Sequence, residues 1–222
     1  MFFHWLEKNP FYFALMVAMV ISFAGLIEIV PNFAQAARPL STTTPRTVLE
    51  LAGKNVYKKD NCIACHSQMI RPFKSETDRY GKYSLSGEYA YDRPFLWGSK
   101  RTGPDLMRVG NYRTTDWHEN HMMDPASVVP GTVMPAYPHQ FKNIADIATA
   151  YANANTQKQL FGVPYDTEGM PKLGSWEEAK AAALEEAKAI VADMKNQEVK
   201  DKVANGEIPE IVALIAYLNS LK

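Results

Sequence analysis

The sequence predicts a mainly α-helical protein, in which one N-terminal transmembrane helix precedes a helical domain with long insertions. Two observations lead to this fold class. Residues 11–30 form a continuous apolar run, and apolar side chains recur at three-to-four spacing both ahead of the two cysteines and near the C-terminus. We therefore expect an N-terminal segment with anchor and polar linker at 1–40 and a domain at 41–222, with insertions at about 67–100 and 155–206.

The apolar run at residues 11–30 reads FYFALMVAMVISFAGLIEIV. With a rise of about 1.5 Å per residue, about 20 helical residues cover about 30 Å, the thickness of a bilayer core. Glu28 lies near the end of the run, where an acidic side chain reaches the interface at low cost. Ala34–Ala36 fit a signal-peptide cleavage site, but the run exceeds the roughly 7 to 15 apolar residues of such a signal. We therefore expect a retained anchor in contact with membrane lipid.

A helix is expected directly ahead of the cysteines. Thr44 is a suitable N-cap, and Pro45 suits the first helical position. Gly53 costs about 1 kcal/mol relative to Ala inside a helix, so it indicates a close crossing with another helix. The expected partner is the last helix, 208–221, with Tyr217 over Gly53. The core-facing stripe of the first helix consists of Val48, Leu49, Ala52, Val56 and Tyr57.

The only two cysteines, Cys62 and Cys65, lie in the stretch NCIACHSQ with His66 directly after them. A structural zinc site needs four ligands, and the pair with ligand spacing, His118 and His121, lies over fifty residues away. A redox pair would begin a helix that follows a strand, whereas these flanks read as helical. A covalent haem uses all three residues, with two thioether bonds and the His66 imidazole on the iron. We therefore predict one covalently bound haem c.

The sixth position of the iron needs a ligand from the opposite face of the haem, so Met69, close after His66, cannot provide it. The best candidate is Met134 in VVPGTVMPAYP, because Pro135 excludes the helical conformation for the residue before it. Alternatively, Met134 is a core side chain like most of the ten methionines. An open or bis-histidine iron also remains an alternative. Other candidate ligands are Met107, Met122, Met123, His118, His121 and His139.

A turn is expected at Gly103 and Pro104 in the stretch RTGPDLMRVG. It would bring the backbone to the haem edge and place a carbonyl to accept the imidazole proton of His66. An ordinary Gly-Pro turn is equally compatible with these residues. Trp97 and Arg101 are candidates for a contact with a haem propionate, because Arg suits carboxylates, although Arg101 equally fits a surface charge.

The first insertion, 67–100, is rich in Tyr and Gly and has no helical period. It predicts a long ordered loop or hairpin. Exposed aromatic side chains favour a protein interface, and cover over the haem is the alternative.

The second insertion, 155–206, predicts one helix from Trp176 to about Ala204. Ser175 and Glu178 form a capping box at its start, and Asn205-Gly206 ends it.

Four stretches, GKNVYKKDNCIACH, TGPDL, MPAYP and LIAYL, follow one another as in a class I cytochrome c domain, which the chain resembles. The stretches CIACHSQMIRPF, RYGKYS, GEYAYDRPFLWGSKRTGPDL and VVPGTVMPAYP resemble the membrane-anchored mono-haem subunit of cbb3-type cytochrome c oxidases. This similarity covers most of residues 1–142. It implies thioethers at Cys62 and Cys65 and axial ligation by His66 and Met134. It also implies a catalytic multispan subunit with b-type haems as partner.

The orientation of the protein in the membrane is inferred from the resemblance. Lys8 and Arg38 lie on opposite sides of the span, so the positive charges alone do not decide which end is cytoplasmic. In similar families, haem is attached on the outer face of bacterial membranes. We expect a single pass through the bacterial inner membrane, with the N-terminus cytoplasmic and the haem domain periplasmic. The balance of 24 basic and 24 acidic residues argues against nucleic acid as a partner.

An iron with His and Met on its two axial positions has no vacant site for a substrate. We therefore expect an electron-transfer subunit without a catalytic site of its own. It would accept single electrons from a di-haem or other c-type cytochrome and pass them to the oxygen-reducing subunit. A free-standing anchored shuttle, and a five-coordinate haem enzyme or sensor, are the alternatives.

The acidic residues near the motifs are assigned to turns or the surface: Asp105, Asp116, Glu119 and Asp124.

Overall fold

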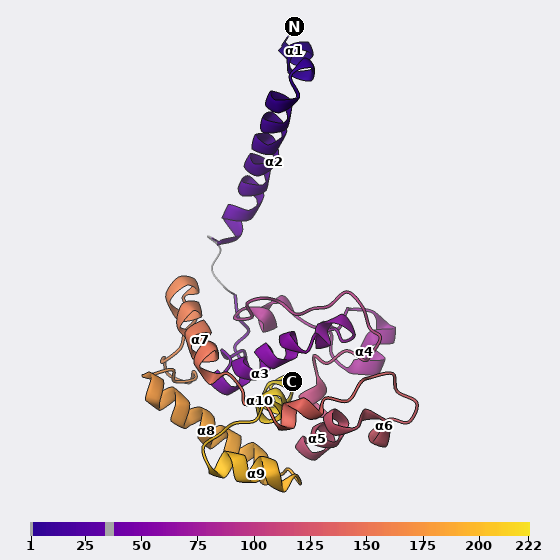
Figure 1. Cartoon of the computed structure of the whole chain (residues 1–222), viewed down its shortest axis with the longest axis vertical. Coiled ribbons are helices and arrows are strands. Elements are labelled where there is room, and N and C mark those ends of the chain that lie inside the picture. The colour runs from indigo at the N-terminus through magenta and orange to yellow at the C-terminus, as the bar shows by residue number, and fades with distance from the viewer. Residues whose placement is uncertain (1, 34–37) are drawn as a thin grey trace. The chain divides into compact units, whose positions relative to one another are not determined.

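Helix α2, Pro10–Phe33, carries the apolar run, and the short helix α1, Phe2–Lys8, precedes it (Figure 1). The computed structural model describes residues 2–33 and 38–222, so the Ala34–Ala36 stretch lies outside the described residues. Within α2, Pro10–Pro31 has a mean hydropathy of 2.4 and is long and apolar enough to cross a membrane. Its large apolar side chains are exposed within the chain, as lipid-facing side chains would be.

The chain divides into two compact units, Met1–Arg38 and Pro39–Lys222. The regular elements of the second unit are helices joined by long loops, and the described residues contain no strand, only an isolated bridge between Ile144 and Pro209. The predicted mainly α class is therefore confirmed. Its helices are α3 (Val48–Lys59), α4 (Lys74–Tyr80), α5 (Thr115–Met123), α6 (Pro125–Val128), α7 (Ile147–Phe161), α8 (Trp176–Ala192), α9 (Gln197–Ala204) and α10 (Glu210–Asn219), with short 3₁₀ turns at Cys62–Ala64, Ser86–Tyr89, Val109–Asn111 and Pro138–Phe141.

Helices α3 and α10 cross at Gly53, as the sequence predicted. A Cβ atom on Gly53 would overlap the carbonyl oxygen of Ala213 and lie 2.8 Å from the Cβ atom of Tyr217. The rings of Tyr57 and Tyr217 lie 5.6 Å apart beside this crossing. Helix α10 is buried along Ile211–Leu218 and forms the centre of the core. Only glycine allows this approach, because any side chain at position 53 would meet backbone.

The start of α3 differs from the prediction. The N-cap is Thr47, and Thr44 lies three residues ahead of it in non-helical chain. The Thr47 hydroxyl accepts the Glu50 N–H at 3.1 Å, and the Glu50 carboxylate accepts the Thr47 N–H at 2.9 Å. This reciprocal pair is a capping box, which outweighs the preference of Pro45 for the first helical position.

The predicted single helix over 176–204 is wrong, because the chain breaks into α8 and α9. Glu119 of α5 accepts the backbone N–H groups of Lys195 and Asn196, each at 2.7 Å. The Asn196 side chain in turn caps α9 by accepting the Val199 N–H at 3.2 Å. These contacts with another helix stabilise the break. The predicted ends are confirmed: Ser175 and Glu178 form a capping box, and α9 ends at Ala204, followed by Asn205 and Gly206.

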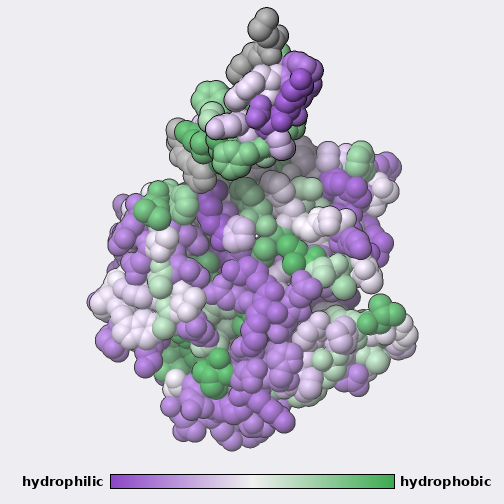
Figure 2. Space-filling model, turned by 45° about the horizontal axis from the view of Figure 1, so that its top comes forward, coloured by the Kyte–Doolittle hydropathy of each residue, from purple (hydrophilic) through white to green (hydrophobic). Residues whose placement is uncertain are grey.

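Segment 67–100 is mostly loop, but it contains the helix α4, which the prediction of a loop or hairpin missed. Its seven residues span about two turns, too few to show a helical period in the sequence. On the face of the second unit seen in Figure 2, hydrophilic side chains predominate. The second unit therefore presents a largely polar surface on this face.

Candidate haem site

The cysteine motif occupies a tight turn directly after α3. Asn61 adopts a left-handed conformation with φ 56°, and the 3₁₀ turn Cys62–Ala64 follows it. Both thiols are free: Cys62 is buried and Cys65 is exposed. Burial, with the neighbouring Asp60, raises the pKa of the Cys62 thiol to about 12. A buried thiol with a raised pKa does not suit a redox nucleophile.

The His66 imidazole is oriented by the turn at Pro104. Its Nδ1 atom lies 2.8 Å from the Pro104 carbonyl oxygen, the kind of contact that the sequence predicted. Because a carbonyl only accepts, Nδ1 carries the proton and donates, and Nε2 keeps its lone pair for a metal. Burial lowers the pKa of His66, so the imidazole is neutral at physiological pH, as a metal ligand must be.

Gly103 forms one wall of the site, against the face of His66. A Cβ atom at this position would overlap Cε1 of the ring and lie 2.8 Å from each ring nitrogen. The Gly103 N–H also donates to the Cys65 carbonyl at 2.9 Å. The turn predicted at Gly103 and Pro104 therefore packs directly against the motif, and only a residue without a side chain fits there.

Arg101 lies in a polar network that joins the segment after His66 to the TGPDL turn. Its guanidinium donates to the Ser67 hydroxyl at 2.6 Å and pairs with Glu76 at 2.8 Å. The carboxylate of Asp105 is fully buried and accepts the Ser67 hydroxyl at 2.6 Å and the backbone N–H of Met69 at 2.9 Å. Asp105 is thus neither a surface nor a simple turn residue, and Glu119 at the α8–α9 break is likewise buried, so both assignments were wrong.

Trp97 stacks on Phe95, with ring centroids 4.7 Å apart, and meets the edge of Tyr89 at 5.7 Å. Trp97 and Phe95 are both partly exposed. The contact of Trp97 and Arg101 with a haem propionate stays a prediction.

Met134 lies in a stretch without helix, residues 130–137, as predicted from Pro135. This Met134 stretch precedes the 3₁₀ turn Pro138–Phe141, and the Met134 side chain packs half-buried against the core. Two contacts hold this stretch in place. The Tyr137 N–H donates to the carbonyl of Met122 in α5 at 2.8 Å. Asp60, two residues ahead of Cys62, accepts the side-chain amide of Gln140 at 2.6 Å. The Met134 stretch is therefore tied to the end of α3, next to the cysteine motif.

The other candidate ligands differ in their surroundings. Met107 and Met122 are buried in apolar clusters, whereas Met123 is partly exposed. His139 lies 3.1 Å from the Asp60 carboxylate. His118 and His121 have buried ring nitrogens without hydrogen-bond partners.

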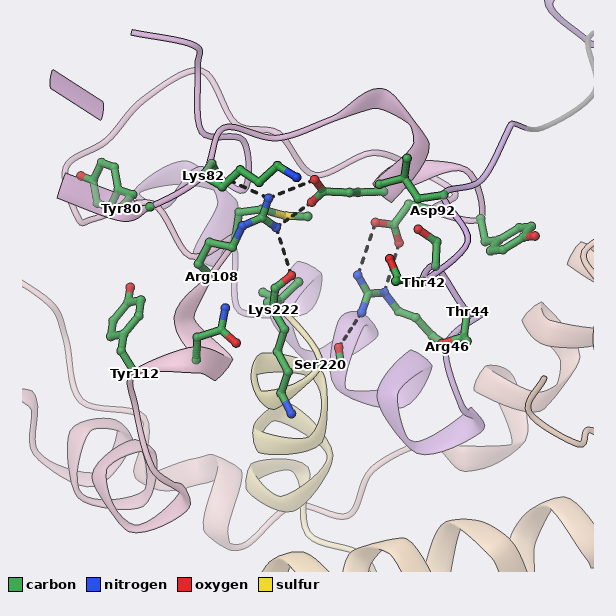
Figure 3. A pocket seen from close by; sticks show the side chains of 18 residues that line it. Thr42, Thr44, Arg46, Tyr80, Lys82, Asp92, Arg108, Tyr112, Ser220 and Lys222 are labelled. Carbon is green, nitrogen blue, oxygen red and sulfur yellow. Dashed lines mark hydrogen bonds and ion pairs between the residues drawn. The ribbon is translucent and has the colours of Figure 1, made fainter. Parts of the chain in front are cut away.

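A cavity of about 740 Å³ lies elsewhere in the second unit, between the start of the domain and its C-terminus (Figure 3). Its two arginines are already paired: Arg46 with Asp92 at 3.2 Å, and Arg108 with Glu88 at 2.6 Å. None of its lining residues belongs to the cysteine motif or to the Met134 stretch.

The family model of the cytochrome c oxidase mono-haem subunit, FixO, matches residues 3–222. The chain belongs to this family. This FixO-family protein is therefore a subunit of a cytochrome c oxidase of the cbb3 type, with one haem and a part in electron transport. Comparison with individual curated proteins gave no match.

The residues fit a single haem. The two thiols are free and lie on one turn, and the Nε2 atom of His66 is free. Gly103 has no side chain and therefore leaves room for the imidazole ring. This donor set suits covalent attachment and axial ligation.

Proposed function

We propose that this FixO-family protein carries single electrons from a di-haem or other c-type cytochrome to the haems of the catalytic, oxygen-reducing subunit. The observation that best supports this role is the contact between His66 Nδ1 and the Pro104 carbonyl at 2.8 Å. It fixes one tautomer and one orientation of a histidine that directly follows two free thiols. Such an arrangement is suited to permanent axial ligation.

In this proposal Cys62 and Cys65 bind the haem through thioethers, and His66 and Met134 ligate its iron. A haem iron with both axial positions filled accepts and releases one electron at a time and has no open position for a substrate. The Pro104 carbonyl holds the imidazole, and Gly103 leaves space for it. The bond from Gln140 to Asp60 holds the Met134 stretch near the motif. Trp97 and Arg101 are assigned a propionate contact.

We also propose the location and the partners. Helix α2 anchors the protein in the bacterial inner membrane by a single pass, with the N-terminus cytoplasmic and residues 41–222 periplasmic. The catalytic partner is a multispan subunit with b-type haems, which lies in the same bilayer. A fixed anchor keeps the donor at high effective concentration beside its acceptor, without any strong contact between the soluble parts.

Purification of the intact membrane complex tests this function. A pyridine haemochrome spectrum is expected to show c-type and b-type haem together, in a complex that contains a multispan subunit. Isolation of the c-type haem on this chain alone, in mild detergent, would identify a free-standing shuttle and contradict the proposal. Ready binding of carbon monoxide by the reduced chain itself would identify a five-coordinate iron and contradict it too.

The covalent attachment has its own test. In the double variant Cys62→Ala/Cys65→Ala, acidified acetone is expected to extract the haem, because no thioether holds it. In the wild type the haem should stay with the polypeptide. Retention of haem by the double variant would overturn the attachment at these two residues.

A further inference from the structure

Helix α5 carries two histidines whose ring nitrogens have no partner. His118 is 1% exposed, and neither of its ring nitrogens makes a hydrogen bond. The buried Nδ1 atom of His121, one turn further along, also has none. Leaving a buried polar group unpaired costs about 1–3 kcal/mol. Three such atoms on one helix indicate that a polar group from outside the protein chain belongs beside them.

The surroundings of these histidines favour an anion. Burial, followed by the charges of His121 and Arg113, lowers the pKa of His118 to about 4, so its imidazole is neutral and has one N–H to donate. The Arg113 guanidinium lies 4.2 Å from the ring centroid of Trp117, and no carboxylate among the described residues forms an ion pair with it. The site thus offers N–H donors and one positive charge without a negative partner.

The acidic residues of α5 do not supply that negative charge, because they have other partners. Asp116 accepts the Thr114 hydroxyl at 2.6 Å and lies 3.4 Å from the Lys195 ammonium group. Glu119 accepts the two backbone N–H groups at the α8–α9 break. In the described part of the chain, no group of three His, Cys, Asp or Glu side chains is placed to hold a metal ion.

The two histidines lie beside the candidate haem site. Next to them on α5, the Met122 carbonyl accepts the Tyr137 N–H at 2.8 Å, which ties the end of the helix to the Met134 stretch. The unpaired nitrogens therefore lie on a helix that is hydrogen-bonded to the Met134 stretch.

We propose that His118 and His121 donate hydrogen bonds to one haem propionate, the one that Trp97 and Arg101 do not contact, and that Arg113 supplies the compensating charge. This inference rests on the proposed haem site. The propionates are the anionic groups of a haem, and a carboxylate accepts several N–H donors at once. A propionate at this position would accept one N–H from each neutral imidazole and would bring a negative charge to Arg113.

The test uses the full-length protein with its haem and the variants His118→Leu, His121→Leu and His118→Gln. Resonance Raman spectra report the propionate bending modes, and a spectroelectrochemical titration gives the reduction potential. Both Leu variants are expected to shift the propionate modes and to lower the potential, because an unbonded carboxylate charge favours the ferric iron. His118→Gln keeps an N–H donor and should restore most of both values. Asn120→Leu, on the exposed side of the same helix, is the matched control and should change neither.

If His118→Leu does not retain haem, Arg113→Gln decides the matter, because Arg113 is exposed and its replacement leaves the core intact. Arg113→Gln should shift the propionate modes and the reduction potential in the same direction as the two Leu variants do. Wild-type values in His121→Leu and Arg113→Gln would overturn the inference. So would loss of methionine ligation in His121→Leu with unchanged propionate modes, since His121 would then serve Met134. A wild-type protein without covalent haem would instead refute the proposed function.

Discussion

The Nδ1 atom of His66 lies 2.8 Å from the carbonyl oxygen of Pro104, although the two residues are 38 positions apart in the chain. The contact joins the cysteine motif to the TGPDL turn, and the Asp105 carboxylate, one residue after Pro104, secures the same join through Ser67 at 2.6 Å. A histidine held at its second nitrogen has one tautomer and little freedom to rotate. The orientation of the proposed iron ligand is therefore a property of the polypeptide itself.

We expect Gly103→Ala to displace the His66 ring. The added methyl group would overlap Cε1 of the imidazole, and overpacking of this kind costs about 1–3 kcal/mol. The variant should lose the contact with Pro104 and with it the low-spin haem spectrum. Optical spectra of the purified protein measure this, with the exposed neighbour Thr102→Ala as control. A wild-type spectrum in Gly103→Ala would show that the ring has another position when haem is bound.

Met134→Ala is expected to abolish the weak long-wavelength band of a methionine-ligated ferric haem, because the thioether sulfur is lost. The reduced variant should then bind carbon monoxide at the open position. Met123→Ala, which removes a partly exposed methionine from the end of α5, should keep the band. Persistence of the band in Met134→Ala would assign the sixth ligand to another residue.

Local patterns in the sequence were sufficient for the parts of the fold that depend on neighbouring residues. The apolar run of α2 and the Ser175–Glu178 capping box are examples. Gly53 was informative for a different reason, because a glycine inside a helix has few explanations other than a close crossing. The break between α8 and α9 was not predictable, because it depends on Glu119, which is distant in sequence. The same is true of Asp105, whose burial depends on partners from another loop.

Part of the candidate site was likewise predictable from the sequence motifs. The spacing of Cys62, Cys65 and His66, and the Pro after Met134, each restrict a local geometry. The unpaired state of His118 was not readable, because it requires knowing that no other segment reaches its ring. The sequence showed this residue only as a candidate ligand.

Gly53→Ala is expected to destabilise the second unit by about 1–3 kcal/mol or more, because its methyl group would overlap the Ala213 carbonyl oxygen in the core helix α10. Backbone cannot move aside as a flexible side chain does. Chemical denaturation followed by far-UV circular dichroism gives the free energy of unfolding. Lys58→Ala, an exposed change on the same helix, should stay within about 0.5 kcal/mol of wild type. Equal stability of both variants would contradict the tight crossing.

Glu186 of α8 makes stability depend on pH, because burial, followed by the charge of Glu50, raises the pKa of its carboxyl group from 4.5 to about 7. A carboxyl with a raised pKa in the folded state binds its proton more tightly there than in the unfolded chain. Its contribution is therefore complete below pH 4.5 and is lost as the pH rises through about 7. Since the side chain is partly exposed, Glu186→Gln should raise the free energy of unfolding at pH 8 by about 1–2 kcal/mol and leave it unchanged at pH 4. Denaturant titrations at the two pH values measure this, with the exposed Glu185→Gln as control. An equal effect at both pH values would show that the change acts through packing and not through the charge.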